Sequence, residues 1–525
     1  MRIGAFYSHA EEKCDFTVWA PLLEQVAVSI EGAHACTIPM QKDEYGYWHA
    51  TLNEIAAQSN YRYELNGHLT RPDPASFFQP DGVHGVSQLV DHAAFHWADA
   101  SWKGIPLEAM IIYELHIGTF TAQGTFEGII KQVDTFRELG VNAIELMPVA
   151  QFPGARNWGY DGAYPFAVQN SYGGPQGLKN LVNTCHKKNL AVILDVVYNH
   201  LGPEGNYLAD FGPYFTDKYR TAWGKAVNFD DAYSFGARNF FIQNALYWLK
   251  EYHIDALRLD AIHGIFDMGA KHILQELSEE VGTYAKKAKR DAILIAESDL
   301  NDARIIRPKS LGGYGINGQW CDEFHHCLHT VLTQEKSGYY QDFGSIEQLK
   351  RVFKEGFVYT GEYSRHRKRF FGNSYNDRET TQLVVFSQNH DQVGNRMKGE
   401  RLSSLVNFES LKLAACGVIF SPFVPLLFMG EEYGEEAPFL YFVSHGDESL
   451  IQAVREGRKK EFSSFSWQGE CPDPQAEKTF FDSRLNAALR NKGHHQALFG
   501  FYKKLIQLRK KIPALSHSSG EHCRV

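Results

Sequence analysis

Long hydrophobic runs, metal-spaced cysteines and a surplus of basic residues are all missing from this sequence. No stretch is long enough to cross a bilayer, and residues 1 to 13 contain no apolar signal core. The eight cysteines are scattered without CxxC spacing, a pattern more typical of a reduced cytoplasmic enzyme than of a disulfide scaffold or zinc site. The net charge of -9 is spread along the chain and gives no nucleic-acid footprint. We therefore expect a cytoplasmic protein without membrane or nucleic-acid partners.

The amino-terminal part of the sequence is typical of an all-β domain. The chain has 525 residues, 44% of them hydrophobic and 14% aromatic, enough to build large cores in two to four domains. Over residues 1 to 95, short alternating runs such as 14–19 and 25–30 are separated by turn residues at the spacing of a β-sandwich. The Pro-rich segment 71–76 indicates an ordered linker. Because no carboxylate pair stands out here, a docking or substrate-shaping role is favoured.

From Met110 onward the pattern alternates between strand, loop and helix. Thr125 is expected to cap a helix that ends at Gly140. The expected strands are 111–116, 141–148, 190–200, 254–260, 292–297, 319–322, 383–386 and 424–428. This pattern predicts an α/β fold, a (β/α)8 TIM barrel with loop insertions over residues 96–515, the long insertion falling at about 201–234. Residues 516–525 are expected to be a tail or the start of a truncated carboxyl-terminal domain.

One strand carries two opposite charges on the same face. In the stretch 254–263, Asp260 stands at the carboxyl end of the expected strand, and Arg258 lies two residues earlier. Burying two charges costs desolvation free energy, so a buried pair with no function would be unexpected here. Charged groups at the carboxyl ends of barrel strands usually line an active site. A structural ion pair at a strand end is the alternative interpretation.

Ionisable residues stand at four of the expected strand ends, where the apolar runs stop, namely His200, Asp260, Glu297 and Asp391. Three carboxylates in one barrel mouth raise the pKa of at least one, so that an acid and an ionised neighbour coexist. Retaining glycoside cleavage needs such a pair about 5 Å apart. We assign Asp260 as nucleophile, Glu297 as acid and then base, and Asp391 as the group that holds substrate hydroxyls and favours the distorted ring. Arg258 would keep Asp260 ionised.

A divalent-metal site built from the same carboxylates is the competing interpretation. It is less favoured because Arg258 would repel a cation there, so the sequence predicts neither metal nor cofactor.

Aromatic residues supply candidate sugar platforms. Tyr160, in the stretch 158–161 after the second strand, is expected to stack on a sugar ring, unless it packs on its own barrel.

Four short regions resemble the alpha-amylase superfamily of glycoside hydrolases. They are Asp195-Val-Val-Tyr-Asn199-His200, Arg258-Leu-Asp260-Ala-Ile-His263, Ile295-Ala-Glu297-Ser and Asn389-His390-Asp391. The resemblance implies an amino-terminal β-sandwich before the barrel. It also implies that Asp260, Glu297 and Asp391 are nucleophile, acid/base and transition-state stabiliser. Residues expected around the cleaved sugar are Tyr160, His200, Arg258, His263, Asn389 and His390.

Within this superfamily, further stretches most resemble the malto-oligosyltrehalose trehalohydrolase family. They are 72–76, 79–84, 320–326, 361–365 and 389–396. The resemblance implies cleavage of the α-1,4 bond next to a terminal trehalose, and a maltooligosyl trehalose synthase as pathway partner. Residues expected to recognise the trehalose unit are Asp322, Phe324, His325 and His326, with barrel packing as an equal alternative for Phe324.

The sequence departs from the family pattern in two places. Members usually continue into a carboxyl-terminal β-sandwich, whereas this sequence runs through a helix over 501–512 and ends after a polar tail. Some amylases hold calcium through the residue matching Asn199, but the loop after the third strand offers no dense carboxylate cage, and we predict no calcium. Two alternatives remain: a glycogen-branching glucan transferase, and a noncatalytic glucan-binding protein on the same fold.

Overall fold

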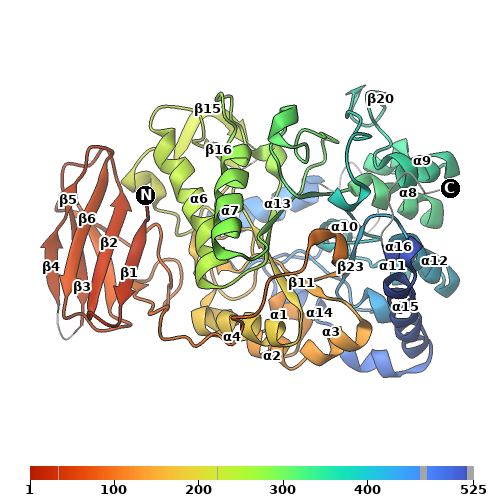
Figure 1. Ribbon diagram of the computed structural model, residues 1–525, viewed down its shortest axis with the longest axis horizontal. Helices are drawn as coiled ribbons and strands as arrows, with labels where there is room; N and C mark the ends of the chain where they lie inside the picture. The colour runs from red at the N-terminus through yellow and green to blue at the C-terminus, as the bar shows by residue number, and fades with distance from the viewer. Residues whose placement is uncertain (33–34, 222, 462–469, 517–525) are drawn as a thin grey trace.

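A closed barrel of parallel strands forms the centre of the computed structural model, which describes residues 1–32, 35–221, 223–461 and 470–516 (Figure 1). Within these residues, eight strands follow one another around the barrel in chain order: β10 Ile112–Leu115, β11 Ala143–Leu146, β14 Ala191–Val196, β17 Ala256–Leu259, β18 Ile293–Ala296, β19 Gly318–Trp320, β22 Leu383–Val385 and β23 Val424–Phe428. Strand β23 pairs with β10 and closes the barrel. The predicted (β/α)8 class is confirmed.

The inward face of the barrel changes character along its strands. Ile112, Ala143 and Ala256 belong to one apolar cluster, which fills the barrel near the amino ends of the strands. Side chains two residues further along a strand point to the same face. On these strands, those positions are the charged residues Glu114, Glu145 and Arg258, so the barrel is apolar at its base and charged towards its mouth.

Helices surround the barrel. The longer ones are α4 Gly174–Lys187, α6 Ser234–Glu251, α7 Ile273–Ala288, α8 Asp322–Thr333, α9 Ile346–Glu355, α12 Phe408–Ile419, α13 Glu448–Glu461 and α15 Gly493–Lys511. The single helix expected from Thr125 to Gly140 is instead two short ones, α2 Phe126–Ile130 and α3 Val133–Leu139. The ladder tightens between them, where the Gln132 N–H donates to the Ile129 carbonyl three residues back. Both predicted ends are correct, because Thr125 caps α2 and Gly140 ends α3.

The predicted amino-terminal β-sandwich is present and lies beside the barrel (Figure 1). One sheet contains β1 Gly4–Ser8, β2 Lys13–Trp19, β6 Tyr47–Asn53 and β5 Gln41–Lys42; the other contains β4 Cys36–Pro39, β3 Val26–Glu31, β7 Asn60–Leu65, β8 Leu69–Arg71 and β9 Ser87–Gln88. Aromatic side chains join the two parts: Phe77 stacks on Tyr247 of α6 at 4.6 Å, and Trp19 meets Tyr214 edge-on at 4.9 Å. We propose the domain boundary near residue 95, between β9 and β10.

Two segments rise over the barrel mouth. The insertion after β14 contains α5 Leu208–Phe211 and a hairpin of β15 Phe215–Thr221 and β16 Gly224–Val227. Helix α13 follows β23. The tail expected over 516–525 lies, apart from Ser516, outside the described residues.

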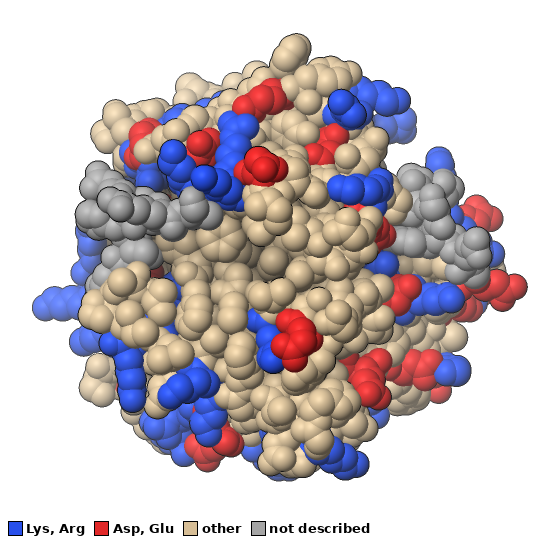
Figure 2. All heavy atoms as spheres, turned by 90° about the vertical axis from the view of Figure 1, so that its right-hand side faces the viewer, with Lys and Arg blue, Asp and Glu red and all other residues tan. Residues whose placement is uncertain are grey.

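Surface charge is mixed on the face that carries the carboxyl-terminal helices. Figure 2 shows blue and red groups interspersed there, with broad uncharged areas between them. In the described part of the chain, no helix combines the length and the apolar character needed to cross a membrane. The cytoplasmic location expected from the sequence stays a prediction.

A buried ionic cluster holds the base of the barrel together. Asp255, just before β17, accepts hydrogen bonds from His186 of α4 at 2.9 Å and from the Trp102 indole at 2.7 Å, and it pairs with Arg290 at 3.1 Å. Burial would raise the pKa of Asp255, but its bond with His186 and the charge of Arg290 bring it below the usual value. The stability that this carboxylate contributes is therefore present above the ordinary aspartate pKa and is lost as the pH falls.

We predict that Asp255→Ala lowers the free energy of unfolding by about 3 to 5 kcal/mol, because it leaves buried cationic partners uncompensated. Thermal unfolding followed by circular dichroism measures the loss. Asp134→Ala serves as the matched control, because Asp134 pairs with Lys188 on the surface and its removal should leave the midpoint almost unchanged. Equal midpoints for the two variants would contradict the role given to the cluster.

Candidate active site

Arg258 lies at the centre of a group of carboxylates in the barrel mouth. Its Nη1 contacts Asp195 Oδ2 at 2.8 Å and Asp260 Oδ1 at 2.9 Å, and its Nη2 lies 3.2 Å from Glu297 Oε2. The guanidinium is fully buried and packs 4.2 Å from the centre of the Trp320 ring. Three successive strands, β14, β17 and β18, thus direct carboxylates at one cation.

Asp260 directly follows β17, and both of its carboxylate oxygens have a donor. Arg258 contacts Oδ1, and the Asn199 amide donates to Oδ2 at 2.8 Å and also to the Asp260 carbonyl at 2.8 Å. The next residue, Ala261, is in the left-handed region with φ of 37°. Such a conformation is costly for a residue with a Cβ and occurs where the surroundings enforce it.

Glu297 directly follows β18 and is held through one oxygen. Its Oε2 accepts from the Ala261 N–H at 2.5 Å and contacts Arg258. Burial raises the pKa of Glu297 well above its usual value; Arg258 opposes the rise, and the negative charges of Asp260 and Asp391 add to it. The raised pKa favours the protonated form of Glu297, as a general acid requires.

A chain of hydrogen bonds links Tyr160 to the barrel wall. The Tyr160 hydroxyl donates to Asp195 Oδ2 at 2.6 Å and lies 2.7 Å from His390 Nε2. His390 Nδ1 bonds Glu114 on β10. Burial would lower the pKa of His390, but the charges of Asp391 and Glu114 raise it to about 10. A protonated His390 donates from both nitrogens, so Glu114 and Tyr160 fix its ring.

Asp391 is the most accessible of the three assigned carboxylates, with its side chain 35% exposed. It does not stand at a strand end, because β22 ends at Val385 and Asp391 lies in the short helix α10 His390–Gly394. Asn395 donates to its Oδ1 at 3.1 Å, and His390 Nε2 lies 3.5 Å from its Oδ2. Its exposure leaves it able to meet a ligand.

The three carboxylates line one open cavity of about 650 Å³, a size that suits several sugar units. Its other lining residues are Trp158, Tyr160, Asp161, His200, Trp223, Ala261, His263, Asn395, Tyr441, Val454, Gly457, Arg458 and Glu461. Burial lowers the pKa of His200, whose ring stacks on Trp223 of the insertion at 4.3 Å. The cavity therefore combines acids, aromatic faces and polar groups.

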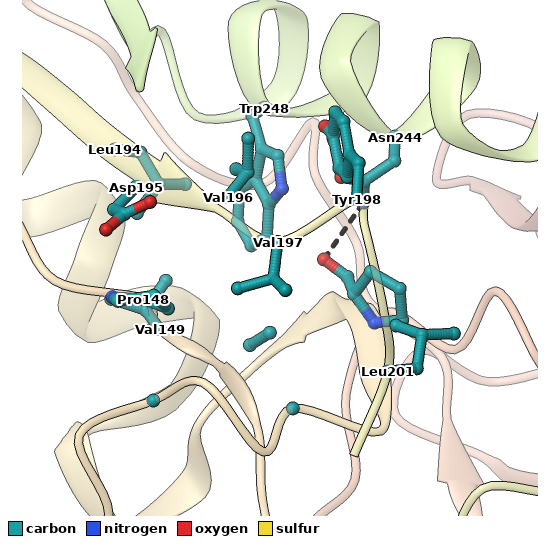
Figure 3. Close-up of a pocket in the computed structure, with 14 residues that line it drawn as sticks. Pro148, Val149, Leu194, Asp195, Val196, Val197, Tyr198, Leu201, Asn244 and Trp248 are labelled. Carbon is teal, nitrogen blue, oxygen red and sulfur yellow. Dashed lines mark hydrogen bonds between the residues drawn. The ribbon is translucent and has the colours of Figure 1, made fainter. Parts of the chain in front are cut away.

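A separate internal cavity of only about 20 Å³ lies behind β14 and has room for about one water. Figure 3 shows it between Val196 at the end of β14, Tyr198 just after the strand, and Trp248 of α6. Asn244 on the same helix accepts from the Tyr198 hydroxyl at 2.7 Å. This cavity is too small for a sugar, and we attribute it to packing behind the strand that carries Asp195.

The four residues expected to recognise trehalose do not act as one set. All lie on α8, so positions four apart share a face while the positions between them point elsewhere. Asp322 and His326 share a face and line a small cavity of about 20 Å³ together with Asp299 and Arg367. Burial and the charges of Asp299 and Asp391 raise the pKa of Asp322 to about 7.

Two residues of that set need correction. Phe324 is fully buried and packs on Phe353 and Phe423, so its role is barrel packing. His325 is also buried, bonding the Ser387 carbonyl at 2.6 Å and the Tyr340 hydroxyl at 2.9 Å, and it reaches neither cavity. The sequence pattern did not predict the helix that begins at Asp322, and it placed Asp322 at the end of the expected strand 319–322.

Asn389 also has a structural position. Its side chain caps α10 by accepting from the Gln392 N–H, and the residue is buried. Asn389 thus fixes the helix that carries Asp391, and it does not line the cavity.

The sequence pattern missed several cavity residues. Trp223 lies next to the turn of the β15–β16 hairpin, and Tyr441, Arg458 and Glu461 come from the segment after β23. These residues do not stand at the ends of barrel strands, so the strand pattern of the sequence does not indicate them. The abundance of Tyr and Phe in the insertion was the only hint towards Trp223.

Possible metal ligands gather at one place among the described residues. Glu436, His494 and His495 bring ligand atoms within 4.8 Å of one another, but none of the three lines the cavity. Beneath the cavity, the buried guanidinium of Arg258 contacts Asp195, Asp260 and Glu297, where a divalent cation would otherwise be held. The arrangement therefore favours acid–base and nucleophilic chemistry.

Two family models match the sequence. The model for the alpha amylase catalytic domain matches residues 74–224, and carbohydrate-binding module 48 (isoamylase N-terminal domain) matches residues 2–76. Malto-oligosyltrehalose trehalohydrolase from Saccharolobus solfataricus is 49% identical over 96% of this chain and 86% of that protein. The protein of that name from Arthrobacter ramosus is 43% identical over 95% of this chain and 87% of its own length.

Solved structures with the same fold also match this chain. A Salmonella typhimurium protein described as an alpha amylase superimposes with a TM-score of 0.91 at 37% identity, covering 99% of this chain and 88% of that one. The pullulanase SAP of group B Streptococcus, with a TM-score of 0.72 and 18% identity, shares the fold.

We predict that Glu297 is protonated at neutral pH. An infrared difference spectrum at pH 7 between the protein and Glu297→Gln should show loss of one protonated-carboxyl stretching band. Glu279→Gln is the control, because hydrogen bonds from Lys271 and Gln275 lower the pKa of Glu279 and its removal should leave that region unchanged. An identical spectrum for Glu297→Gln would mean that Glu297 is ionised.

Proposed function

Since this chain belongs to the malto-oligosyltrehalose trehalohydrolase family of the alpha-amylase superfamily, we propose that it cleaves its substrate by a retaining mechanism at the Asp260–Glu297 pair. The protein is a glycoside hydrolase that cleaves the α-1,4 bond next to the terminal trehalose of a maltooligosyl trehalose. The observation that carries the mechanism is the contact of one buried guanidinium with both Asp260 and Glu297 in a sugar-sized cavity.

In the first step, a carboxylate oxygen of Asp260 attacks the anomeric carbon of the glucose unit before the trehalose. The bond from this carbon to the trehalose oxygen breaks, and that oxygen takes the proton of Glu297. Both protein contacts of Glu297 reach Oε2, so we assign the proton to Oε1. Released trehalose leaves behind a glycosyl ester on Asp260.

In the second step, ionised Glu297 takes a proton from water, and the water oxygen attacks the anomeric carbon. The ester bond to Asp260 breaks, which frees the maltooligosaccharide and restores both side chains. We assign Asp391 to the hydroxyls of the reacting sugar, because it lines the cavity and is the most accessible of the three assigned carboxylates. Tyr160 and His200 are assigned to the same sugar, since both line the cavity, and so is His263.

His390 and Arg258 are assigned supporting roles. His390 is buried and holds Tyr160 in place, while Arg258 orients Asp260 and Glu297. Asp322 and His326 remain candidates for trehalose recognition through the neighbouring cavity, where the charge of Asp391 also acts on Asp322.

The glucan-branching transferase is not favoured by the relatives. The noncatalytic alternative does not account for a buried Glu297 with a raised pKa beside Asp260, because binding alone requires neither residue. We propose that the substrate comes from an enzyme that forms the terminal trehalose linkage, a maltooligosyl trehalose synthase, and that the two act together in trehalose biosynthesis.

The activity predicts a specific product pattern. Incubation with maltotriosyl trehalose should release free trehalose and maltotriose, whereas amylose should gain no branch points. Chromatography of both mixtures measures this, with Asp260→Asn protein as the blank. New α-1,6 branches in amylose would support the transferase, and no change in either substrate would support the binding protein.

Substitutions at the carboxylate pair should have different effects. Asp260→Asn should abolish turnover of every substrate. Glu297→Gln should lower turnover of maltotriosyl trehalose by about 10² to 10⁴ fold, but spare glycosylation by α-maltosyl fluoride, whose leaving group needs no proton. Steady-state and burst kinetics measure both effects.

Asp217→Asn, on the exposed surface of β15, is the control that should retain full activity. Circular dichroism checks that each variant is folded. An Asp260→Asn protein that turns over normally would remove Asp260 from its role, and equal loss on both substrates in Glu297→Gln would remove the acid role of Glu297.

A further inference from the structure

A second large cavity lies outside the barrel, on the side where β10 meets the carboxyl-terminal segment. Its volume is about 290 Å³. It is lined by β10, by the end of α1 Ile117–Phe120 with residues 121–123, by α3 with Gln132, and by η7 Glu431–Tyr433 and η9 Ala487–Asn491 with residues 485–486. It shares no lining residue with the catalytic cavity. The mechanism proposed above makes no use of it.

The floor of this cavity is a buried carboxylate with few donors. Glu432 is only 3% exposed, and the Tyr113 hydroxyl, at 3.2 Å from both of its oxygens, is its one side-chain donor within the described residues. A carboxylate has about four acceptor positions. Glu432 therefore faces the cavity with unused acceptor capacity, and buried polar groups in this condition usually meet water or a ligand.

A cation lies at the opposite wall. Arg490 of η9 lines the cavity and has, within the described residues, no hydrogen bond or ion pair, only a packing contact 5.5 Å from the Phe499 ring. Its charge acts on Glu432 and opposes the rise that burial causes in the pKa of that carboxyl, which stands at about 7. The cavity thus offers a carboxylate that accepts hydrogen bonds and a guanidinium with five N–H donors to the same ligand.

Aromatic rings and amides complete the walls. Phe120 and Phe136 stack at 5.5 Å, and Tyr113 lies 5.1 Å from Phe136, which gives a continuous aromatic surface. Gln123 and Gln132 line the same space with both donor and acceptor groups. An aromatic surface beside planar polar groups matches a pyranose, which presents C–H groups on its faces and hydroxyls around its edge.

We propose that this cavity, here called the accessory cavity, binds one glucopyranosyl unit of a short α-glucan or of trehalose. Sugar hydroxyls donate to Glu432 and accept from Arg490, while one ring face packs on the aromatic surface. The polar and aromatic lining sets the ligand class, and the choice of glucose among pyranoses rests on the proposed function. The volume has room for one hexose ring, so longer chains extend outwards past η9.

Isothermal titration with trehalose and with maltose tests the proposal in the Asp260→Asn protein, which cannot consume either sugar. Two classes of site are expected, one in the catalytic cavity and one in the accessory cavity. Adding Ala487→Trp should remove one class, because Ala487 lines the accessory cavity. Ala488→Trp is the matched control: this neighbour is also exposed, does not line the cavity, and should leave both classes intact.

A second pair of variants tests the chemistry. Arg490→Ala should weaken the accessory class by about tenfold, the size expected for one charge-assisted hydrogen bond. Arg137→Ala, on the exposed side of the adjacent α3, should not change it. Crystals soaked in maltose should show a pyranose between Glu432 and Arg490.

Two classes of site that persist in the Ala487→Trp variant, a single class in the Asp260→Asn protein, or an accessory cavity that stays without sugar in the soaked crystals would overturn the proposal. Its failure is separable from failure of the proposed function. Trehalose release from maltotriosyl trehalose depends on the catalytic cavity and should be unchanged in Ala487→Trp, whereas the titrations need no turnover.

Discussion

The contact of Arg258 with three carboxylates is the interaction on which the catalytic cavity depends. Withdrawing a guanidinium from water costs several kcal/mol, and partners on β14, β17 and β18 offset this cost only if the strands stay in register. Asp195 pairs directly with Arg258 across β14 and β17. The barrel closure therefore sets the position of the nucleophile, and the ion pair in turn favours this register over others.

Charge balance in the mouth explains why the pKa of Glu297 is raised. The buried cations here are Arg258 and, with a pKa of about 10, His390. They face Glu114, Asp195, Asp260 and Asp391, and also Glu145, whose carboxyl has no hydrogen-bond partner among the described residues. Burial and the charge of Glu114 raise the pKa of Glu145 well above its usual value, as burial does for Glu297. In a low-dielectric site with two cations and several acids, burial and repulsion between the carboxylates raise the pKa of some of them, Glu145 and Glu297 among them.

Sequence patterns identified the groups whose position follows from strand periodicity. Asp260 and Glu297 directly follow apolar strands, and a barrel brings the ends of such strands together, so their meeting could be predicted. Phe324 and His325 could not be placed in this way, because they lie on a helix that begins only two residues after β19, and helical rather than strand periodicity decides which of its residues face the core. Trp223 and Arg458 reach the cavity from an insertion and from α13, whose packing over the mouth depends on contacts between distant parts of the chain.

The two faces of β10 connect both cavities to one rigid element. Glu114 points into the barrel and bonds His390, while Tyr113 points outwards and donates to Glu432. Strand β10 is hydrogen-bonded to a neighbouring strand on each side. Binding of a sugar beside Tyr113 is therefore not expected to displace Glu114. A sugar in the accessory cavity should therefore leave the catalytic geometry unchanged, and its effect would be to keep the glucan chain bound to the protein. For glucans longer than maltotriosyl trehalose, a chain held at one point has a raised effective concentration of its other end, which favours repeated encounters with the catalytic cavity without altering the chemical step.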